Sequence, residues 1–215
     1  MITFNIPLST LRAARTHAAE KDTRYYLCGV YLDFKNSRLV ATDGHRMLIC
    51  DGPYLDAPSI IIPNDLIDSA LKCYTGNFGR GKSSGNIEVQ CVLDGTMITI
   101  STLNNGSVSG QLIDGKFPDY ARVLPTALVE EKGGHINHSY VYEACEAILT
   151  YRNKSKGKSE GGLKVYMRGD SPALVTDNVV GIIIVVMPMK SSGTSILDSI
   201  LDHAHKMPEL MQVAA

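Results

Sequence analysis

Hydrophobic and polar residues follow one local pattern that recurs three times along the chain. Each repeat opens with a short β-type run, continues with an amphipathic helix and ends with three β-rich runs separated by turns. Repeats of this kind must be found before single elements are interpreted, because they define the architecture. The order strand–helix–strand–strand–strand predicts antiparallel hairpins with helices on one face, which is an α+β fold.

In the first repeat, a β-type run at 2–7 precedes a helix predicted over 9–20. The apolar residues of this helix recur at helical spacing: Leu8, Leu11, Ala14 and Ala18. The β-rich runs that follow are predicted at 25–33, 38–42 and 46–50. Lys35-Asn36 and Asp43-Gly44 have the composition of turns and are predicted to connect these runs.

The second repeat begins at 59–62, and Pro63-Asn64-Asp65 opens its helix. Its β-rich runs are predicted at 87–93, 96–101 and 107–113. The third repeat begins at 135–137, and Ser139 is predicted to be the N-cap of its helix. Its runs are predicted at 163–168, 173–176 and 179–186. A tail of 25 residues follows Lys190, and its first half is predicted to form an amphipathic helix.

The composition is that of a soluble globular protein. Of the 215 residues, 44% are hydrophobic and 20% are charged, which argues against extensive disorder. The longest apolar run, at 179–189, is too short to span a bilayer. The N-terminus has no signal-peptide pattern, and the five cysteines are scattered without a C-x-x-C pair. We therefore expect a cytoplasmic protein with reduced thiols and no structural zinc.

Candidate catalytic chemistry is weak. Asp43 and His45 suit a hydrolase, but no nucleophile accompanies them in the sequence, and Asp43-Gly44 closes a hairpin more naturally. His135 with His138, and His203 with His205, lack the further ligands that a metal ion needs. We expect no enzymatic activity, no metal and no cofactor.

Basic residues gather on or after the predicted helices of all three repeats, although the net charge is -1. A solvated surface explains each group alone, whereas their repetition favours a basic stripe that contacts phosphates. Contacts with phosphates alone imply sequence-independent binding of double-stranded DNA. The predicted DNA-facing residues are Arg12, Arg15, Lys21, Arg24, Lys72, Arg80, Lys82, Arg152, Lys154, Lys156 and Lys158.

Four blocks of sequence resemble the bacterial-type sliding clamp, the β subunit of DNA polymerase III. Two lie in the first repeat, at 22–29 (DTRYYLCG) and 40–48 (VATDGHRML). The stretch 114–125 (DGKFPDYARVLP) resembles the end of that family's middle domain, and 185–190 (VVMPMK) resembles its C-terminal end. The resemblance implies the clamp fold, with helices lining a ring and antiparallel sheets outside.

The family has a pocket between its middle domain and its chain end, which receives short peptides from the polymerase and the clamp loader. Apolar and methionine side chains suit such a slot, and Arg or His at its rim would orient polar atoms. For the apolar members, simple core packing is the alternative. By resemblance the pocket residues are Leu27, Thr42, Gly44, His45, Arg46, Met47, Pro118, Arg122, Val123, Val185, Val186, Met187, Pro188 and Met189.

The chain departs from the family pattern in its domain content. Residues 1–125 are predicted to form a clamp domain of two repeats that resembles the middle domain. Residues 126–190 are predicted to form a partial C-terminal domain of one repeat, and 191–215 a helical tail. The family's first domain has no counterpart, and Lys190 stands where the family usually has arginine.

These observations predict a compact, phage-like sliding clamp, a processivity factor of DNA replication that encircles duplex DNA and tethers a polymerase. The alternative is a non-encircling clamp-like regulator that binds or competes for clamp partners. The family's rings hold six two-repeat domains, so three repeats per chain favour a homotetramer over a trimer or dimer. In that ring the third repeat, with an open sheet edge, would pair with the third repeat of another chain.

Overall fold

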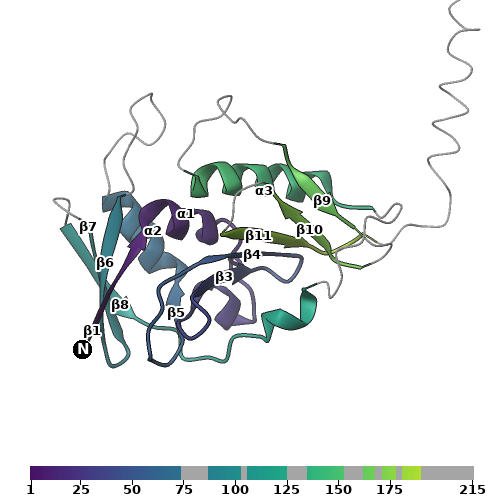
Figure 1. Ribbon diagram of the computed structural model, residues 1–215. Coiled ribbons are helices and arrows are strands. Elements are labelled where there is room, and N and C mark those ends of the chain that lie inside the picture. The colour runs from purple at the N-terminus through teal and green to yellow at the C-terminus, as the bar shows by residue number, and fades with distance from the viewer. Residues whose placement is uncertain are drawn as a thin grey trace, which may run out of the picture.

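The computed structural model describes residues 1–73, 87–102, 106–124, 135–152, 162–167, 171–177 and 181–189 (Figure 1). Repeat one contains β1 (Ile2–Pro7), α1 (Leu8–Arg15), the 3-10 helix η1 (Tyr25–Leu27), β2 (Gly29–Asp33), β3 (Arg38–Thr42) and β4 (Arg46–Asp51). Repeat two contains β5 (Ile60–Pro63), α2 (Asn64–Cys73), β6 (Glu88–Asp94), β7 (Met97–Thr102) and β8 (Gly106–Gln111). The 3-10 helix η2 (Tyr120–Val123) precedes repeat three, which contains α3 (His138–Tyr151), β9 (Lys164–Tyr166), β10 (Ala173–Thr176) and β11 (Ile182–Val186).

The first two repeats exchange their opening strands. β1 of repeat one pairs with β6 of repeat two, and β5 of repeat two pairs with β2 of repeat one, both antiparallel. The result is a four-stranded sheet in the order β1-β6-β7-β8 and a second sheet that begins β5-β2-β3-β4. Neither repeat is therefore complete without the other, as expected for two halves of one domain.

The third repeat extends the second sheet within the same chain. β11 pairs antiparallel with β4, with Ile184 opposite Leu48, so the sheet has seven strands in the order β5-β2-β3-β4-β11-β10-β9. Repeat three was predicted to have an open sheet edge, and this contact covers one side of it. The edge along β11 is occupied in the chain itself, and β9 is the outer strand that remains.

The inner strands of this sheet are buried on both faces. Leu48 and Cys50 of β4 pack in one hydrophobic core with the helices, while Met47 and Ile49 point into a second core on the opposite face. β11 alternates in the same way, because Ile184 joins the helix-side core and Val185 the other. Two-sided burial explains why these strands read as continuous apolar runs in the sequence.

The three helices lie side by side in one layer over the sheets (Figure 1). α1 lies in the middle and contacts both α2 and α3. α1 buries its apolar residues completely, including Leu8, Leu11 and Ala14. The helix layer on one side of antiparallel sheets confirms the predicted α+β architecture.

Helix α1 is shorter than predicted and ends at Arg15 instead of Glu20. The Thr16 hydroxyl donates to the carbonyl of Ala13 at 2.7 Å, and this side chain-to-backbone bond competes with continued helix. The chain then turns, and the Ala19 amide donates to the Leu27 carbonyl at 3.0 Å. The run at 25–33 is correspondingly divided, because η1 occupies its first three residues and β2 begins only at Gly29.

Repeat three departs from the predicted pattern at its start. Residues 135–137 do not form a strand, since His135 makes only an isolated bridge with Met189. The N-cap of α3 is Asn137 instead of Ser139, and its side chain accepts a hydrogen bond from the Ser139 amide at 2.9 Å. An Asx cap two residues earlier therefore starts the helix at His138.

Gly29 marks the closest approach of two backbones in the seven-stranded sheet. A Cβ atom at this position would lie 2.6 Å from the Ile62 carbonyl oxygen and 2.8 Å from the Ile61 side chain. No side chain fits there, so glycine allows β2 and β5 to pair directly after the turn at η1.

Candidate peptide-binding site

A pocket of about 200 Å³ opens on the sheet face that points away from the helices. It brings together residues from η1, the β3–β4 turn, the segment around η2, and the end of β11. The predicted pocket residues that line it are Leu27, Thr42, Gly44, Arg46, Met47, Pro118, Val123, Val185 and Met187. Segments more than a hundred residues apart in the sequence thus form one site.

The turn between β3 and β4 forms one wall. Asp43 Oδ1 accepts hydrogen bonds from the amides of His45 and Arg46, at 2.8 and 3.0 Å, and closes the turn. Gly44 adopts a φ of +91°, and a Cβ there would lie 2.8 Å from the Arg24 guanidinium. The positive φ requires glycine, whereas the Arg24 guanidinium lies at the end of a flexible side chain that can move. The turn also gives Asp43 a structural role in place of the hydrolase alternative.

The segment 113–124 forms the opposite wall and is fixed to the sheet at several points. The Phe117 ring stacks on Tyr31 with a centroid distance of 4.6 Å. The Tyr120 hydroxyl donates to Asp33 at 2.8 Å, and burial together with this bond raises the pKa of Tyr120 above its usual value. Tyr120 therefore remains a donor, and Pro118 and Val123 are held beside the sheet.

The end of β11 supplies the floor next to Met47. Val185 points to the pocket side and lines it, whereas Val186 points to the helix-side core. Both residues were predicted to line the pocket, but neighbouring residues of a strand point to opposite faces. The Met187 amide donates to the His45 carbonyl at 2.8 Å, which fixes Met187 at the rim.

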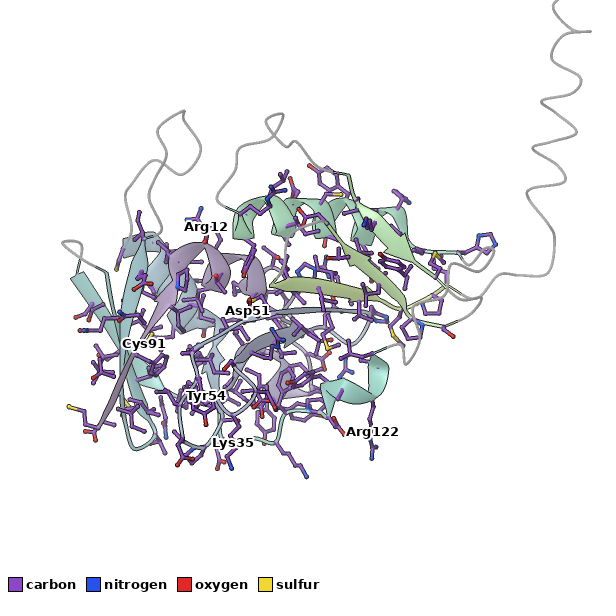
Figure 2. All side chains as sticks on the ribbon, viewed as in Figure 1. Arg12, Lys35, Asp51, Tyr54, Cys91 and Arg122 are labelled. Atoms are coloured by element: carbon purple, nitrogen blue, oxygen red, sulfur yellow. The ribbon has the colours of Figure 1, made fainter. Side chains whose placement is uncertain are left out.

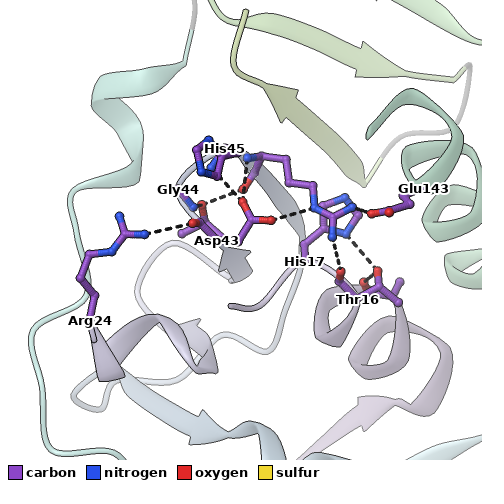
Figure 3. Close-up of polar contacts among 10 residues, drawn as sticks. Thr16, His17, Arg24, Asp43, Gly44, His45 and Glu143 are labelled. Atoms are coloured by element: carbon purple, nitrogen blue, oxygen red, sulfur yellow. Dashed lines mark hydrogen bonds and ion pairs between the residues drawn. The ribbon is translucent and has the colours of Figure 1, made fainter. Parts of the chain in front are cut away.

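Arg46 lines the pocket but is bound from within the protein. Figure 3 shows its partners Thr16, Asp43 and Glu143 close together. Its guanidinium donates to Asp43 and to the Thr16 carbonyl, at 3.0 and 3.2 Å, and forms an ion pair with Glu143 of α3. The side chain is only 13% exposed. Arg46 thus joins repeat one to repeat three, while its predicted role of orienting a ligand's polar atoms stays a prediction.

The remaining predicted pocket residues do not line the cavity. His45 is exposed and its ring lies near Tyr140 of α3, with a centroid distance of 6.5 Å. Arg122 projects away from η2 and is 84% exposed (Figure 2). Pro188 and Met189 lie beyond the rim, and Met189 is anchored by a hydrogen bond from its amide to the His135 carbonyl.

Four pocket residues were absent from the predicted set: Arg24, Phe117, Asp119 and Tyr120. Arg24 was predicted to face DNA, but its guanidinium donates to Asp22 and to the Asp43 carbonyl at the pocket wall. The hydrogen bonds that the Arg24 side chain and backbone amide donate to Asp22 lower the pKa of Asp22 to about 2. The blocks at 22–29 and 114–125 contain all four residues, so the resemblance could have indicated them.

The predicted DNA-facing residues divide into distinct groups. Arg15 forms ion pairs with Glu20 and Asp68, and Arg152 pairs with the buried Asp177, so neither guanidinium is presented to phosphates. Lys21 and Lys72 are exposed, and Figure 2 shows Arg12 on α1, in the helix layer. The other predicted residues lie outside the described part of the chain: Arg80, Lys82, Lys154, Lys156 and Lys158. The predicted tail at 191–215 lies outside it as well.

Within the described ranges, no group of three or more His, Cys, Asp or Glu residues is placed to hold a metal ion. The same part of the chain contains no helix long and apolar enough to cross a membrane. The five cysteines are free thiols, and burial raises the pKa of the Cys91 thiol to about 12. Cys91 and the equally buried Cys50 serve as small core residues.

The two-sheet fold, the layer of helices and the pocket beside the end of β11 together define a sliding-clamp fold. The solved structures that it resembles include the Caulobacter crescentus pol III beta, with a TM-score of 0.69 and 20% identity. A second is the DNA polymerase sliding clamp of Pseudomonas aeruginosa with ligand, with a TM-score of 0.68 and 23% identity. These similarities cover 89% and 88% of this chain, and 67% of each solved chain.

A family model described as DNA polymerase III beta subunit, central domain, matches residues 8–119. The beta sliding clamp of Pseudomonas aeruginosa is 37% identical over 177 residues, which covers 76% of this chain and 46% of that protein. That of Proteus mirabilis is 32% identical over 144 residues, covering 58% and 34%. The chain therefore belongs to the DNA polymerase III beta subunit family, and it spans about a third to a half of these relatives' length.

A buried histidine, His17, lies beside the ion-pair network at the pocket (Figure 3). His17 is completely inaccessible, its Nδ1 lies 2.9 Å from the Thr16 hydroxyl, and its Nε2 has no partner among the described residues. Burial and the positive charge of Arg46 lower its pKa from 6.5 to about 3. The imidazole is therefore neutral in the folded protein.

Replacing His17 should change the pH dependence of stability. The unfolded chain binds a proton near pH 6.5 while the folded chain does not, so stability is full above pH 6.5 and falls as the pH is lowered toward 3. Between about pH 7.5 and about pH 5, this costs about 2 kcal/mol. Denaturant unfolding at both values should show that His17→Gln lacks this loss. The exposed His138→Gln is the control, and an equal pH loss in wild type and His17→Gln would contradict the assignment.

Proposed function

We propose that this protein is a DNA sliding clamp, which encircles duplex DNA and tethers a replicative polymerase through the pocket described above. The observation that carries the proposal is the pocket itself. In a member of the β-subunit family, it forms where the first two repeats meet the end of β11, and its lining is mainly apolar. Such a slot suits the apolar anchors of a short extended peptide.

Peptide recognition would depend on side chains that adapt in shape. Met47 and Met187 both line the pocket, and methionine accommodates varied apolar ligands because it is unbranched and polarisable. Leu27, Val123 and Val185 complete the apolar surface. The polymerase and the clamp loader would use the same pocket, each through a short peptide.

The proposed contact with DNA is weak and independent of sequence. A closed ring holds DNA by topology, so a few sliding phosphate contacts suffice and a large positive field is unnecessary. Arg12, Lys21 and Lys72 are the described residues that remain candidates, on or near helices that would line the hole. No catalytic step is part of this function.

The ring would contain four chains. The family's rings hold six two-repeat domains, so chains of three repeats would form a ring of four chains. The outer strand β9 and the half-exposed Val141 and Cys145 of α3 provide a surface for the third repeat of another chain. Closed symmetric assemblies of this kind commonly use isologous contacts. Trimers and dimers are the other possible rings.

Encirclement predicts that binding depends on DNA topology. Protein placed on nicked circular DNA by a clamp loader, or trapped there during ring opening, should be retained through gel filtration and released after the DNA is cut once. Linearisation leaves every phosphate contact unchanged, so only a topological link explains such release. Retention that is the same on circular and linear DNA would favour the non-encircling regulator.

The pocket assignment predicts different effects for two neighbouring methionines. Met187→Ala should weaken binding of a fluorescein-labelled clamp-binding peptide from a bacterial replicative polymerase by about 2 kcal/mol, or about 30-fold, because it removes an apolar side chain that the bound peptide would cover. Met189→Ala should leave the affinity unchanged, since Met189 lies outside the pocket and is 51% exposed. Fluorescence anisotropy measures both. Equal affinities for wild type and Met187→Ala would remove the pocket from the proposal.

A further inference from the structure

The segment 113–124 (the wall segment) forms one side of the pocket without being a strand of either sheet. It supplies Phe117, Pro118, Asp119, Tyr120 and Val123 to the pocket lining. Its start is fixed where the Ile113 amide donates to the Ile61 carbonyl at 3.0 Å. The turn at η2 is closed locally, by the Leu124 amide on the Ala121 carbonyl at 3.2 Å, and this bond does not reach the sheet. Side-chain contacts therefore decide where the wall lies.

A tyrosine hydroxyl ties the wall segment to β2. Tyr120 donates to Asp33 Oδ2 at 2.8 Å, and Asp33 is the last residue of β2 and only 7% exposed. Hydrogen bonds to a carboxylate are shorter and about twice as strong as those between neutral groups. Without this acceptor, the partly buried hydroxyl would be left unsatisfied, which is unfavourable. The bond therefore favours one position of Tyr120 and of the wall around it.

Asp33 is itself held by the turn between β2 and β3. Its Oδ2 also accepts a hydrogen bond from Asn36 Nδ2 at 2.8 Å, and its Oδ1 accepts one from the Asn36 amide at 3.3 Å. The turn therefore fixes the carboxylate in the orientation that Tyr120 needs. Asp33 is not part of the pocket lining, so it can influence a bound peptide only through the residue that it holds.

Aromatic contacts hold the same part of the wall segment against the sheet. Tyr31 lies two residues before Asp33 and so on the same face of β2. Its ring stacks on Phe117 at a centroid distance of 4.6 Å and meets Tyr120 edge-on at 6.4 Å. Such pairs are favourable over centroid distances of about 4.5–7 Å, whereas a hydrogen bond needs a narrow range of distance and angle. The rings keep the wall on the sheet, and the bond to Asp33 fixes its position.

We propose that Asp33 is a positioning residue for peptide binding, which acts through Tyr120 to keep the wall segment where it completes the pocket. This inference rests on the proposed function, because it concerns the same pocket. Without the bond, the wall would exchange between its observed position and others in which the pocket is incomplete. The apparent affinity for a peptide then falls in proportion to the fraction of molecules with a complete pocket.

Peptide-binding kinetics of Asp33 variants test this role. Asp33→Ala removes the acceptor and should lower the association rate constant about tenfold, because only molecules with the wall in place bind, and leave the dissociation rate unchanged. Asp33→Asn should bind like the wild type. Its amide oxygen can replace Oδ2 and keep both 2.8 Å bonds, so that only the 3.3 Å bond is lost. Stopped-flow fluorescence anisotropy with the labelled polymerase peptide measures both rates.

Asn36→Ala is the matched control, because it removes the other side-chain partner of Asp33 and leaves the bond to Tyr120. It should bind at the wild-type rate. Equal slowing in Asn36→Ala and Asp33→Ala would mean that Asp33 only stabilises its turn, and would overturn the proposal. An unchanged association rate in Asp33→Ala, or slow association in Asp33→Asn, would overturn it as well.

Tyr120→Phe breaks the same bond from the other side and keeps the ring, so it tests the proposal even if Asp33→Ala does not fold. It should slow association by the same factor, and adding Asp33→Ala to it should cause no further slowing, since both changes remove one interaction. Circular dichroism checks that each variant is folded. Additive effects of the two changes would contradict a shared role.

Amide hydrogen exchange of the free protein separates this inference from the proposed function, because it needs no peptide. Exchange across 113–124 should be about tenfold faster in Asp33→Ala and Tyr120→Phe than in the wild type, and unchanged in Asn36→Ala. If the wild type binds no peptide, the proposed function is refuted, while faster exchange in these variants still supports the hold of Asp33 on the wall. Equal exchange in the wild type and Asp33→Ala would overturn it.

Discussion

The pairing of β4 with β11 is the contact on which the rest of the structure depends. It joins repeat three to repeat one as a continuation of one sheet, and it places Met47 beside Val185 on the same face. Without it, the pocket would lose its floor and α3 would lose its neighbour α1. An edge-to-edge backbone contact thus converts separate repeats into a surface with one binding site.

Burial on both faces makes this junction rigid. Every residue of β11 from Ile182 to Val186 packs in one of two cores, and the Arg46–Glu143 ion pair ties α3 to the same junction. Removing one partner from a buried ion pair costs about 3–5 kcal/mol, whereas an exposed pair contributes about 1 kcal/mol or less. Arg46 is only 13% exposed but Glu143 is 40% exposed, so this pair lies between the two cases. Its main contribution is to hold the pocket in shape.

Much of the fold could be predicted from the sequence because its elements are local. Turn residues and alternation located β3 and β10 with their observed bounds, and helical spacing located all three helices. The early end of α1 depends on one hydroxyl, Thr16, whose competition with the helix has no periodic signal. The partner of β11 was not predictable, because an apolar run shows that a strand is buried and not which strand lies beside it.

The candidate site could also be predicted only in part, because the sequence shows residue types and not which side chains meet. Resemblance in short blocks brought together the residues of the pocket wall, and strand alternation then separated Val185 from Val186. Basic residues could be counted in the sequence, but their charge partners could not. Arg15 and Arg152 are paired with carboxylates of distant segments, Asp68 and Asp177, so their position near helices was a poor guide to exposure.

Amide hydrogen exchange of the folded chain tests the β4–β11 junction most directly. If the two strands form one sheet, amides of Ile182–Val186 and of Arg46–Asp51 should exchange with similar, strong protection, and both should slow further when a clamp-binding peptide is added. Rapid exchange along Ile182–Val186 beside a protected β4 would contradict the account, because β11 would then not be held in the sheet that forms the pocket.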